Sequence, residues 1–270
     1  MKKALGIMVA GLLLFGLAGQ GMAAFSTLDL VRTIYDPSSA STTEIGSDLG
    51  ANALTTAGAY TANTYVGDHL ATSLFSDPAA TLEVSYYALN GSTSAWVTGS
   101  TTDTAQKLLL HKNTNLSGLS TSLLGYYAGL STISGTASSV LGSTAVGNNS
   151  YYQLAENNGT GVGTFASALS NISPSHTDAT ISLAALTTNG YVDSTLWYFL
   201  YNNNTGTVGT EVVTIRTFLT DSATSTNIDK NGTYIATEID PQAPTVPIPP
   251  SLLLLAPGLL GLIGVRSRRA

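Results

Sequence analysis

The chain has 270 residues and no cysteine, 10% of its residues are charged, and its formal net charge is −6. The absence of cysteine excludes a disulfide framework, a thiolate metal site and a cysteine nucleophile. Five of the ten basic residues lie near the two ends and all sixteen acidic residues lie between them, so the central part carries five basic against sixteen acidic residues, a formal charge of −11. Such a surface repels phosphate groups, which argues against nucleic-acid binding.

The first 24 residues have the composition of a signal peptide. Two lysines follow Met1, residues 4–18 form an apolar run, and small residues come next. We expect signal peptidase to cleave after Ala23 or Ala24, which leaves an exported domain at residues 25–240. A retained membrane anchor is the alternative, but the apolar run is short for a helix that spans a bilayer.

A hairpin pattern is clear in the first half of the exported domain. Residues 81–89 (TLEVSYYAL) and 95–98 (AWVT) lie on either side of an Asn-Gly pair at 90–91. This dipeptide suits the positive φ angles of tight hairpin turns. The period of two of a strand places three residues of the first segment on one face: Leu82, Val84 and Tyr86.

The middle of the domain is harder to assign. From residue 117 to residue 150 the sequence is dominated by Ser, Leu, Gly and Thr in no strict period, so short strands and irregular loops both stay open. Further Asn-Gly pairs, at 158–159, 189–190 and 231–232, indicate additional turns.

Strand patterns dominate the rest of the domain. Residues 195–201 (TLWYFLY) and 211–219 (EVVTIRTFL) enclose a polar loop, and residues 234–239 add a third strand. Residues 28–35 (LDLVRTIY) predict an opening strand, so we expect the two ends of the domain to pair or to lie adjacent. The predicted fold class is all-β, a single antiparallel β-sandwich of the jelly-roll or Ig-like kind.

Few residues could carry catalysis. The chain has no Gly-x-Ser-x-Gly elbow, and its imidazole bases are His69, His111 and His176. His69 follows Asp68, and His176 lies in the run 175–178 (SHTD), but adjacent residues of a strand point to opposite faces and do not form a triad by themselves. No histidine spacing fits a zinc site. We therefore predict no catalytic residues and no cofactor, apart from a calcium candidate.

One loop nearly matches a calcium-binding pattern. A hard cation needs oxygen ligands at alternate positions and a terminal acidic residue, and the candidates are Asn227, Asp229, Asn231 and Glu238. A hairpin turn is the competing interpretation, because the Asn-Gly pair already explains the glycine and a strand pattern stands where a helix should begin. Residues 229–233 (DKNGT), like residues 156–160 (ENNGT), also match an acidic-extended form of the Asn-x-Ser/Thr glycan acceptor.

The chain ends in three distinct segments. Residues 241–250 form a proline-rich linker, which must be extended. Residues 251–265 (SLLLLAPGLLGLIGV) are apolar or small, and counting back to Val246 gives about the 20 residues that a membrane-spanning segment needs. The arginines that follow would hold the end in the cytoplasm, so we predict a transmembrane segment at 251–270 with an Arg-rich cytoplasmic end.

This tail resembles the sorting signal of PEP-CTERM proteins, and more narrowly the variant that opens Val-Pro-Leu-Pro. The resemblance rests on the apolar run, on the motif and on the terminal arginines, namely Val246, Pro247, Pro249, Pro250, Arg266, Arg268 and Arg269. One position departs from the family, since Ile248 stands where the name-giving motif has Glu.

The resemblance implies a processing route. In that family an exosortase-like transpeptidase of Gram-negative bacteria cuts at the proline motif, after a transient stay in the inner membrane, and delivers the protein to the cell surface. Many members accompany exopolysaccharide production, which makes exopolysaccharide a candidate partner. A plain C-terminal membrane anchor is the alternative.

The sequence as a whole predicts an exported cell-surface or extracellular-matrix protein that is not an enzyme. Two other functions stay open. An exported carbohydrate-active hydrolase would need two carboxyl groups about 5 to 10 Å apart in one cleft. A calcium-stabilised adhesin module would show a melting temperature that rises with calcium.

Overall fold

The computed structural model describes most of the exported domain, in segments at residues 25–36, 43–50, 64–76, 78–91, 93–100, 107–108, 113–134, 136, 139–144, 149–156, 180–200, 207–208 and 210–241. In these residues ten strands form one antiparallel sheet with the order β3-β12-β11-β9-β5-β4-β1-β2-β7, in which β8 also pairs with β4. The strands are β1 (Val31–Tyr35), β2 (Thr43–Asp48), β3 (Thr64–Ala71), β4 (Glu83–Asn90), β5 (Ser94–Ser100), β7 (Ser139–Ser143), β8 (Ile181–Ser182), β9 (Tyr191–Leu200), β11 (Thr210–Thr220) and β12 (Tyr234–Ile239).

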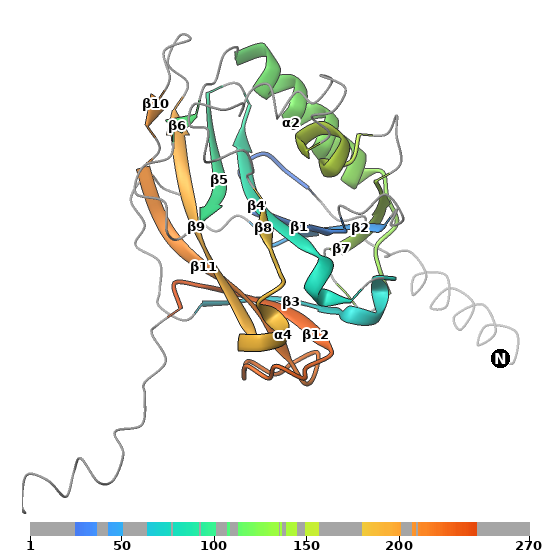
Figure 1. Ribbon diagram of the computed structural model, residues 1–270. Helices are drawn as coiled ribbons and strands as arrows, with labels where there is room; N and C mark the ends of the chain where they lie inside the picture. Colours follow the sequence, from blue (N-terminus) through green and yellow to red (C-terminus); the bar gives the residue numbers. More distant parts are fainter. Residues whose placement is uncertain are drawn as a thin grey trace, which may run out of the picture.

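Helices are few. They comprise α2 (Asn113–Ala128), the single turn α4 (Leu186–Asn189), the 3₁₀ turns η1 (Thr72–Leu74) and η2 (Ala79–Thr81), and the π-helical turn η3 (Tyr152–Glu156). Helix α2 lies on the outer side of the sheet, and α4 lies at the opposite end of the molecule beside the connection from β11 to β12 (Figure 1).

The large sheet curves until it is nearly a barrel. Its edge strands β3 and β7 lie close together, and the Ser139 hydroxyl of β7 donates a hydrogen bond to the Asp68 carboxylate of β3. Among the described residues no backbone ladder joins these two strands. The all-β prediction is confirmed to the extent that the fold is mostly β with one large antiparallel sheet. The two facing sheets of a sandwich are not confirmed, since the strands form one continuous sheet beside the small pair β6 (Lys107–Leu108) and β10 (Thr207–Val208).

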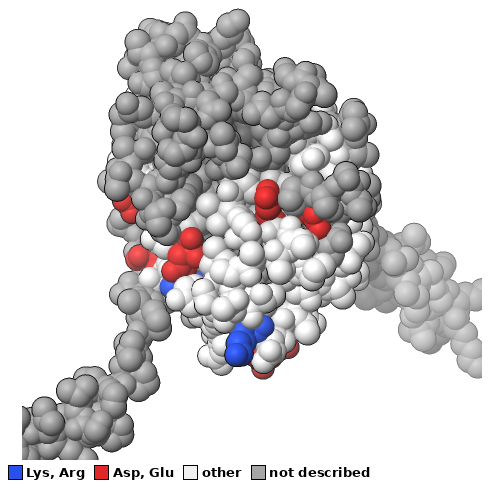
Figure 2. All heavy atoms as spheres, in the orientation of Figure 1, with Lys and Arg blue, Asp and Glu red and all other residues white. Residues whose placement is uncertain are grey.

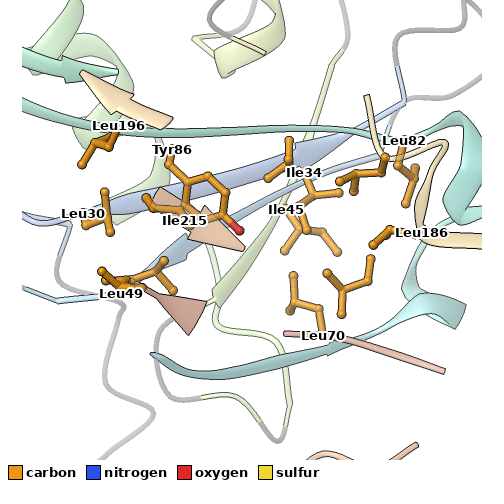
Figure 3. Packing of buried hydrophobic residues seen from close by; sticks show 14 of the residues in the cluster. Leu30, Ile34, Ile45, Leu49, Leu70, Leu82, Tyr86, Leu186, Leu196 and Ile215 are labelled. Carbon is orange, nitrogen blue, oxygen red and sulfur yellow. The ribbon is translucent and has the colours of Figure 1, made fainter. Parts of the chain in front are cut away.

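One core cluster fills the interior of the curved sheet. Alternate residues of each strand point inward, as the period of two requires. The predicted shared face of Leu82, Val84 and Tyr86 is confirmed, because all three belong to this cluster. Figure 3 shows the interior packing of Leu30, Ile34, Ile45, Leu49, Leu70, Leu82, Tyr86, Leu186, Leu196 and Ile215.

A second core cluster lies on the outer face, under α2. Leu123, Leu124 and Tyr127 of the helix pack there with residues of β1, β4, β5 and β9. The helix approaches β2 closely at Gly46, where a Cβ atom would stand 2.9 Å from the Tyr127 ring. Strand β1 is therefore buried on both faces along its whole length. Residues 117–150, for which the sequence left strands and loops open, contain most of this helix and β7.

The Asn-Gly pairs do not all form hairpin turns. Asn90-Gly91 joins β4 to β5 as predicted, with Gly91 at φ +51° and the Thr93 amide donating to the Asn90 carbonyl at 2.9 Å. Asn189-Gly190 instead ends α4, where Gly190 adopts a left-handed conformation at φ +81°. A left-handed glycine is as suitable for a helix C-terminus as for a hairpin, so the dipeptide alone cannot separate the two. The pair at 158–159 lies outside the described residues.

The C-terminal strands agree with the sequence. Strands β9 and β11 pair with each other, and β12 covers the predicted residues 234–239. The opening strand β1 pairs with β2 and β4, so it is not a neighbour of β12 in the sheet. The two strands still meet across the interior, where Arg32 Nη1 donates to Thr237 Oγ1 at 2.9 Å. The expectation that the two ends of the domain lie adjacent is confirmed in this form.

Candidate functional site

A connected group of polar side chains crosses the interior of the barrel. We call it the interior polar network, and it comprises Arg32, Ser47, Asp68, Tyr86, Ser139, Thr217 and Thr237. The Arg32 guanidinium forms an ion pair with Asp68, with Nη2 3.0 Å from Oδ2, and it also donates to the Asp68 carbonyl at 3.2 Å. Nη2 reaches Ser47 Oγ at 3.0 Å. Arg32 has no exposed surface, so the ion pair is shielded from solvent.

The network links strands that do not pair. The Ser47 and Ser139 hydroxyls are 2.6 Å apart, and Ser139 in turn donates to Asp68, which completes a ring of hydrogen bonds across the seam between β3 and β7. On the other side, the Tyr86 hydroxyl lies 2.7 Å from Thr217 Oγ1 and 2.8 Å from Thr237 Oγ1. Buried polar groups of this kind stabilise a fold only when they satisfy one another. Arg32 Nε is the exception, with no hydrogen-bond partner among the described residues.

A second polar group lies on the outer face of the sheet around Glu44 of β2. Its carboxylate is fully buried and accepts three hydrogen bonds. Tyr127 of α2 donates its hydroxyl to Oε1 at 2.6 Å, and the backbone amides of Tyr151 and Tyr152 donate to Oε1 and Oε2, each at 2.9 Å. Glu44 thereby holds both α2 and the segment around η3 against the sheet.

Burial raises the pKa of Glu44 to about 7. The hydrogen bonds from Tyr127 and from the two backbone amides act in the opposite direction, because they favour the ionised carboxylate. Within the described part of the chain, no cationic side chain lowers this pKa. Desolvation is therefore the larger effect, and Glu44 can hold or release a proton near neutral pH.

A chain of hydroxyl groups continues from Glu44 into the outer core. Thr33 Oγ1 lies 3.0 Å from the Tyr127 hydroxyl and 3.2 Å from the Tyr87 hydroxyl. Burial raises the pKa of both tyrosines, so each keeps its proton at neutral pH. Hydroxyl groups both donate and accept hydrogen bonds. The direction of the hydrogen bonds in this series can therefore reverse when Glu44 gains a proton.

A second carboxyl group stands near Glu44 on the same face. Tyr35 of β1 pairs with Glu44 on one side and with Glu83 on the other, which puts the two glutamates two strand spacings apart, about 10 Å between Cα atoms. The Tyr35 hydroxyl donates to Glu83 Oε2 at 3.2 Å. Glu83 is partly exposed, unlike Glu44.

A third charged group lies on the outer face of β9, β11 and β12. Arg216 binds Asp193 through two hydrogen bonds of 2.7 and 2.8 Å, and its guanidinium stands 4.3 Å from the centre of the Tyr191 ring. Glu238 lies opposite Arg216 on β12. The Asp193 hydrogen bonds hold the pKa of Arg216 above its usual value, so it stays charged.

The structure separates the residues that the search for catalysis singled out. Asp68 points into the interior to bind Arg32, whereas His69 Nε2 donates to the Ser225 carbonyl at 2.9 Å. These neighbours point in opposite directions, as expected for a strand. His111 and the run 175–178 lie outside the described residues.

The calcium candidates fall into two places. Asn227, Asp229 and Asn231 lie in the connection between β11 and β12, but Glu238 lies within β12 opposite Arg216. One Asp229 carboxylate oxygen accepts the Asn231 amide at 2.9 Å. No group of three His, Cys, Asp or Glu side chains suited to a metal occurs in the described residues. Calcium binding stays a prediction.

The processing signals at the two ends are not part of the described structure. Ala23 and Ala24 precede the first described residue, and the sorting residues Val246, Pro247, Pro249, Pro250, Arg266, Arg268 and Arg269 follow the last. Among the helices that the structure describes, none has the length and apolar character needed to cross a membrane.

Comparison of the chain with protein-family models, with curated proteins and with solved structures gives no match. The fold and the polar clusters thus define a class in structural terms only, that of a mostly β protein built on one nearly closed antiparallel sheet.

Sequence reasoning did not find the two polar clusters. Arg32 and Glu44 each stand in a strand pattern where an exposed charge is the ordinary expectation. A signal did exist, because Arg32 lies on the same face of its strand as Leu30 and Ile34, and an isolated charge in an apolar row calls for a buried partner. Which carboxylate provides that partner is decided by the sheet order.

Proposed function

We propose that this chain is an exported cell-surface or extracellular-matrix protein whose barrel is a structural module and not a catalyst. The proposal rests on the fact that the buried carboxylates Asp68 and Glu44 are already bound by groups of the protein itself. The Asp68 carboxylate is occupied by Arg32 and Ser139, and Glu44 accepts three donors that fasten neighbouring elements. Groups engaged in this way hold strands and helices together and are not available to a substrate.

Export and sorting rest on the two ends of the chain. The signal peptide at residues 1–24 directs export, and signal peptidase removes it. The tail after residue 240 resembles a PEP-CTERM signal, which supports transient insertion in the inner membrane, cutting by an exosortase-like transpeptidase and delivery to the surface. The transmembrane segment at residues 251–270 is part of this proposal.

The low charge of the surface favours binding to an uncharged polymer. Figure 2 shows one face of the molecule, on which the described surface is mostly uncharged, with scattered acidic and fewer basic side chains. Such a surface offers little attraction to nucleic acids or anionic lipids. Exopolysaccharide is the partner that the sorting signal favours, through hydrogen bonds to the many Ser, Thr and Asn side chains of the exported domain.

A carbohydrate-active hydrolase is the competing function, and the carboxyl pair Glu44 and Glu83 is the arrangement that would serve it. Their Cα atoms are about 10 Å apart, and an inverting mechanism needs the carboxyl groups themselves to lie roughly 6.5 to 9.5 Å apart. Glu44, however, has no exposed surface, and both of its oxygens already accept hydrogen bonds. A sugar ring could reach it only after the segment at 150–154 and α2 had moved away, so this geometry favours the noncatalytic role.

Cell fractionation followed by intact mass measurement tests the proposal. We expect the mature protein at the cell surface, with its N-terminus at or next to Phe25 and its C-terminus within residues 246–251. Replacement of Arg266, Arg268 and Arg269 by Ala should leave the tail uncut. A protein that keeps its whole tail in the inner membrane would overturn the sorting proposal, and deletion of the gene without any change in the matrix would overturn the matrix role.

A further inference from the structure

The connection between β11 and β12 contains an exposed Asn-x-Thr triplet. Residues 229–233 read Asp-Lys-Asn-Gly-Thr, with an acidic residue two places before the asparagine. The side chains of Asn231 and Thr233 are exposed, and neither makes a hydrogen bond to the residues that the structure describes. The acceptor amide and the hydroxyl two residues later are both available to an enzyme.

The backbone around Asn231 is held in place. Asp229 Oδ1 accepts the Asn231 amide at 2.9 Å, and the Gly232 amide donates to the Asp229 carbonyl at 2.8 Å, which closes a tight turn. A Cβ atom on Gly232 would collide with the Thr220 carbonyl, so the middle residue of the triplet must be glycine. The Thr233 carbonyl accepts the Thr72 amide at 2.8 Å. The turn therefore projects from the barrel in a fixed conformation and needs no unfolding to be reached.

The position of this turn also leaves room for a bulky group. It follows β11 beside α4, at the end of the molecule away from α2 (Figure 1). Ile228 packs near Gly190 at the end of α4, which anchors the base of the connection. A sugar on Asn231 would extend from this end and would not disturb either core cluster.

Two other triplets that begin at a described asparagine lack these features. The triplet at 90–92 begins at Asn90, which is half-buried at the end of β4 and has Ala88 in place of the acid. The triplet at 115–117 lies within α2, and Asn113 stands where the acid would be. Asn231 differs from both of them, because it is exposed, lies in a turn and has an acidic residue two positions before it.

We infer that Asn231 is an N-glycosylation site of the exported protein, modified from a polyprenyl-pyrophosphate-linked sugar. The side-chain amide nitrogen forms a bond to C1 of the sugar while the bond from C1 to the pyrophosphate oxygen breaks. The amide proton passes to a base of the transferase, and the polyprenyl pyrophosphate leaves with the electron pair. The inference requires export but is independent of how the C-terminal tail is processed.

Peptide mass spectrometry of the protein from its natural host tests the inference. Protein recovered from the exported fraction should carry sugar mass on the peptide that contains Asn231. The mass gain should disappear in Asn231→Gln and in Thr233→Ala, and it should persist in Thr233→Ser, which keeps the hydroxyl. Asn90→Gln is the matched control and should leave the modification unchanged.

Three results would overturn the inference. The first is an exported protein whose Asn231 peptide carries no added mass. The second is a sugar mass that survives in Asn231→Gln, which would place it on another residue. The third is loss of the mass in Thr233→Ser, because a serine hydroxyl satisfies the triplet. Circular dichroism of each variant shows whether it is folded, and fractionation shows export independently of the modification.

Discussion

Glu44 combines complete burial with three hydrogen-bond donors and no cationic partner among the described residues. The donors favour the ionised carboxylate and burial favours the neutral acid, and the pKa of about 7 shows that burial has the larger effect. In an unfolded chain the same group has a pKa near 4.5. Between these two values the folded protein binds a proton that the unfolded chain has lost, so the contribution of Glu44 to stability falls as the pH rises.

We predict that replacing Glu44 by Gln flattens the pH dependence of stability between about pH 4.5 and 7. In the unmodified protein Glu44 is most favourable below pH 4.5, and its contribution falls by about 3 kcal/mol by pH 7, as the displacement of its pKa requires. Urea unfolding of both proteins at several pH values gives the difference. The variant Glu83→Gln, at a partly exposed position, should keep the slope of the unmodified protein. Parallel curves for Glu44→Gln and the unmodified protein would contradict the assignment.

At the scale of elements, α2 depends on packing and not on its own sequence. It has no acidic residue in its first turn and no basic residue in its last, and its glycines and β-branched residues lower its intrinsic helix propensity. Its stability comes from Leu123, Leu124 and Tyr127 against the outer face of the sheet. Gly46 permits this contact, because any larger residue would meet the Tyr127 ring.

We predict that Gly46→Ala destabilises the protein by about 1 to 3 kcal/mol, the usual cost of overpacking, since the Tyr127 ring and with it α2 must shift. Gly125→Ala is the matched control. Gly125 is exposed within α2 and has nothing within 4 Å of the added Cβ, so this change should stabilise the helix by roughly 0.5 to 1 kcal/mol. Chemical denaturation measures both. Equal effects of the two substitutions would mean that α2 does not rest on β2 in this way.

At the scale of the whole molecule, the barrel is closed by side chains. The Arg32–Asp68 pair and the serines beside it connect β1, β2, β3 and β7, whereas no backbone ladder joins β3 to β7 in the described residues. Removing one partner of a buried pair leaves an uncompensated charge in the interior.

We therefore predict that Asp68→Asn costs about 3 to 5 kcal/mol of stability. The comparison is Asp193→Asn, at a partly exposed aspartate that pairs with Arg216. The cost there should be about 1 kcal/mol or less, because an exposed carboxylate gains little from an ion pair and because Glu238 and the Tyr191 ring remain beside the arginine. Urea unfolding at constant pH gives both values. Replacing the buried pair together, as Arg32→Met with Asp68→Leu, should recover much of the loss. If the double variant were as unstable as Asp68→Asn, the uncompensated charge would not be the cause.

The sequence by itself indicated β1, β4, β5, β9, β11 and β12, the shared face of Leu82, Val84 and Tyr86 and the hairpin at Asn90-Gly91, because periodicity and turn chemistry are properties of neighbouring residues. It also determined the charge balance of the exported domain, and it is the sole basis for the signal peptide and the sorting tail. It left residues 117–150 open because α2 has little helical signal of its own.

Only the tertiary structure decided how the strands close and which charges are buried. Arg32 and Thr237 meet across 205 residues of sequence, and Tyr127 reaches Glu44 across 83. Contacts at that separation follow from sheet order and curvature, which local patterns do not specify. The same period of two is compatible with two facing sheets and with one curved sheet, so the sequence indicated antiparallel strands and the packing of their side chains made them a nearly closed barrel.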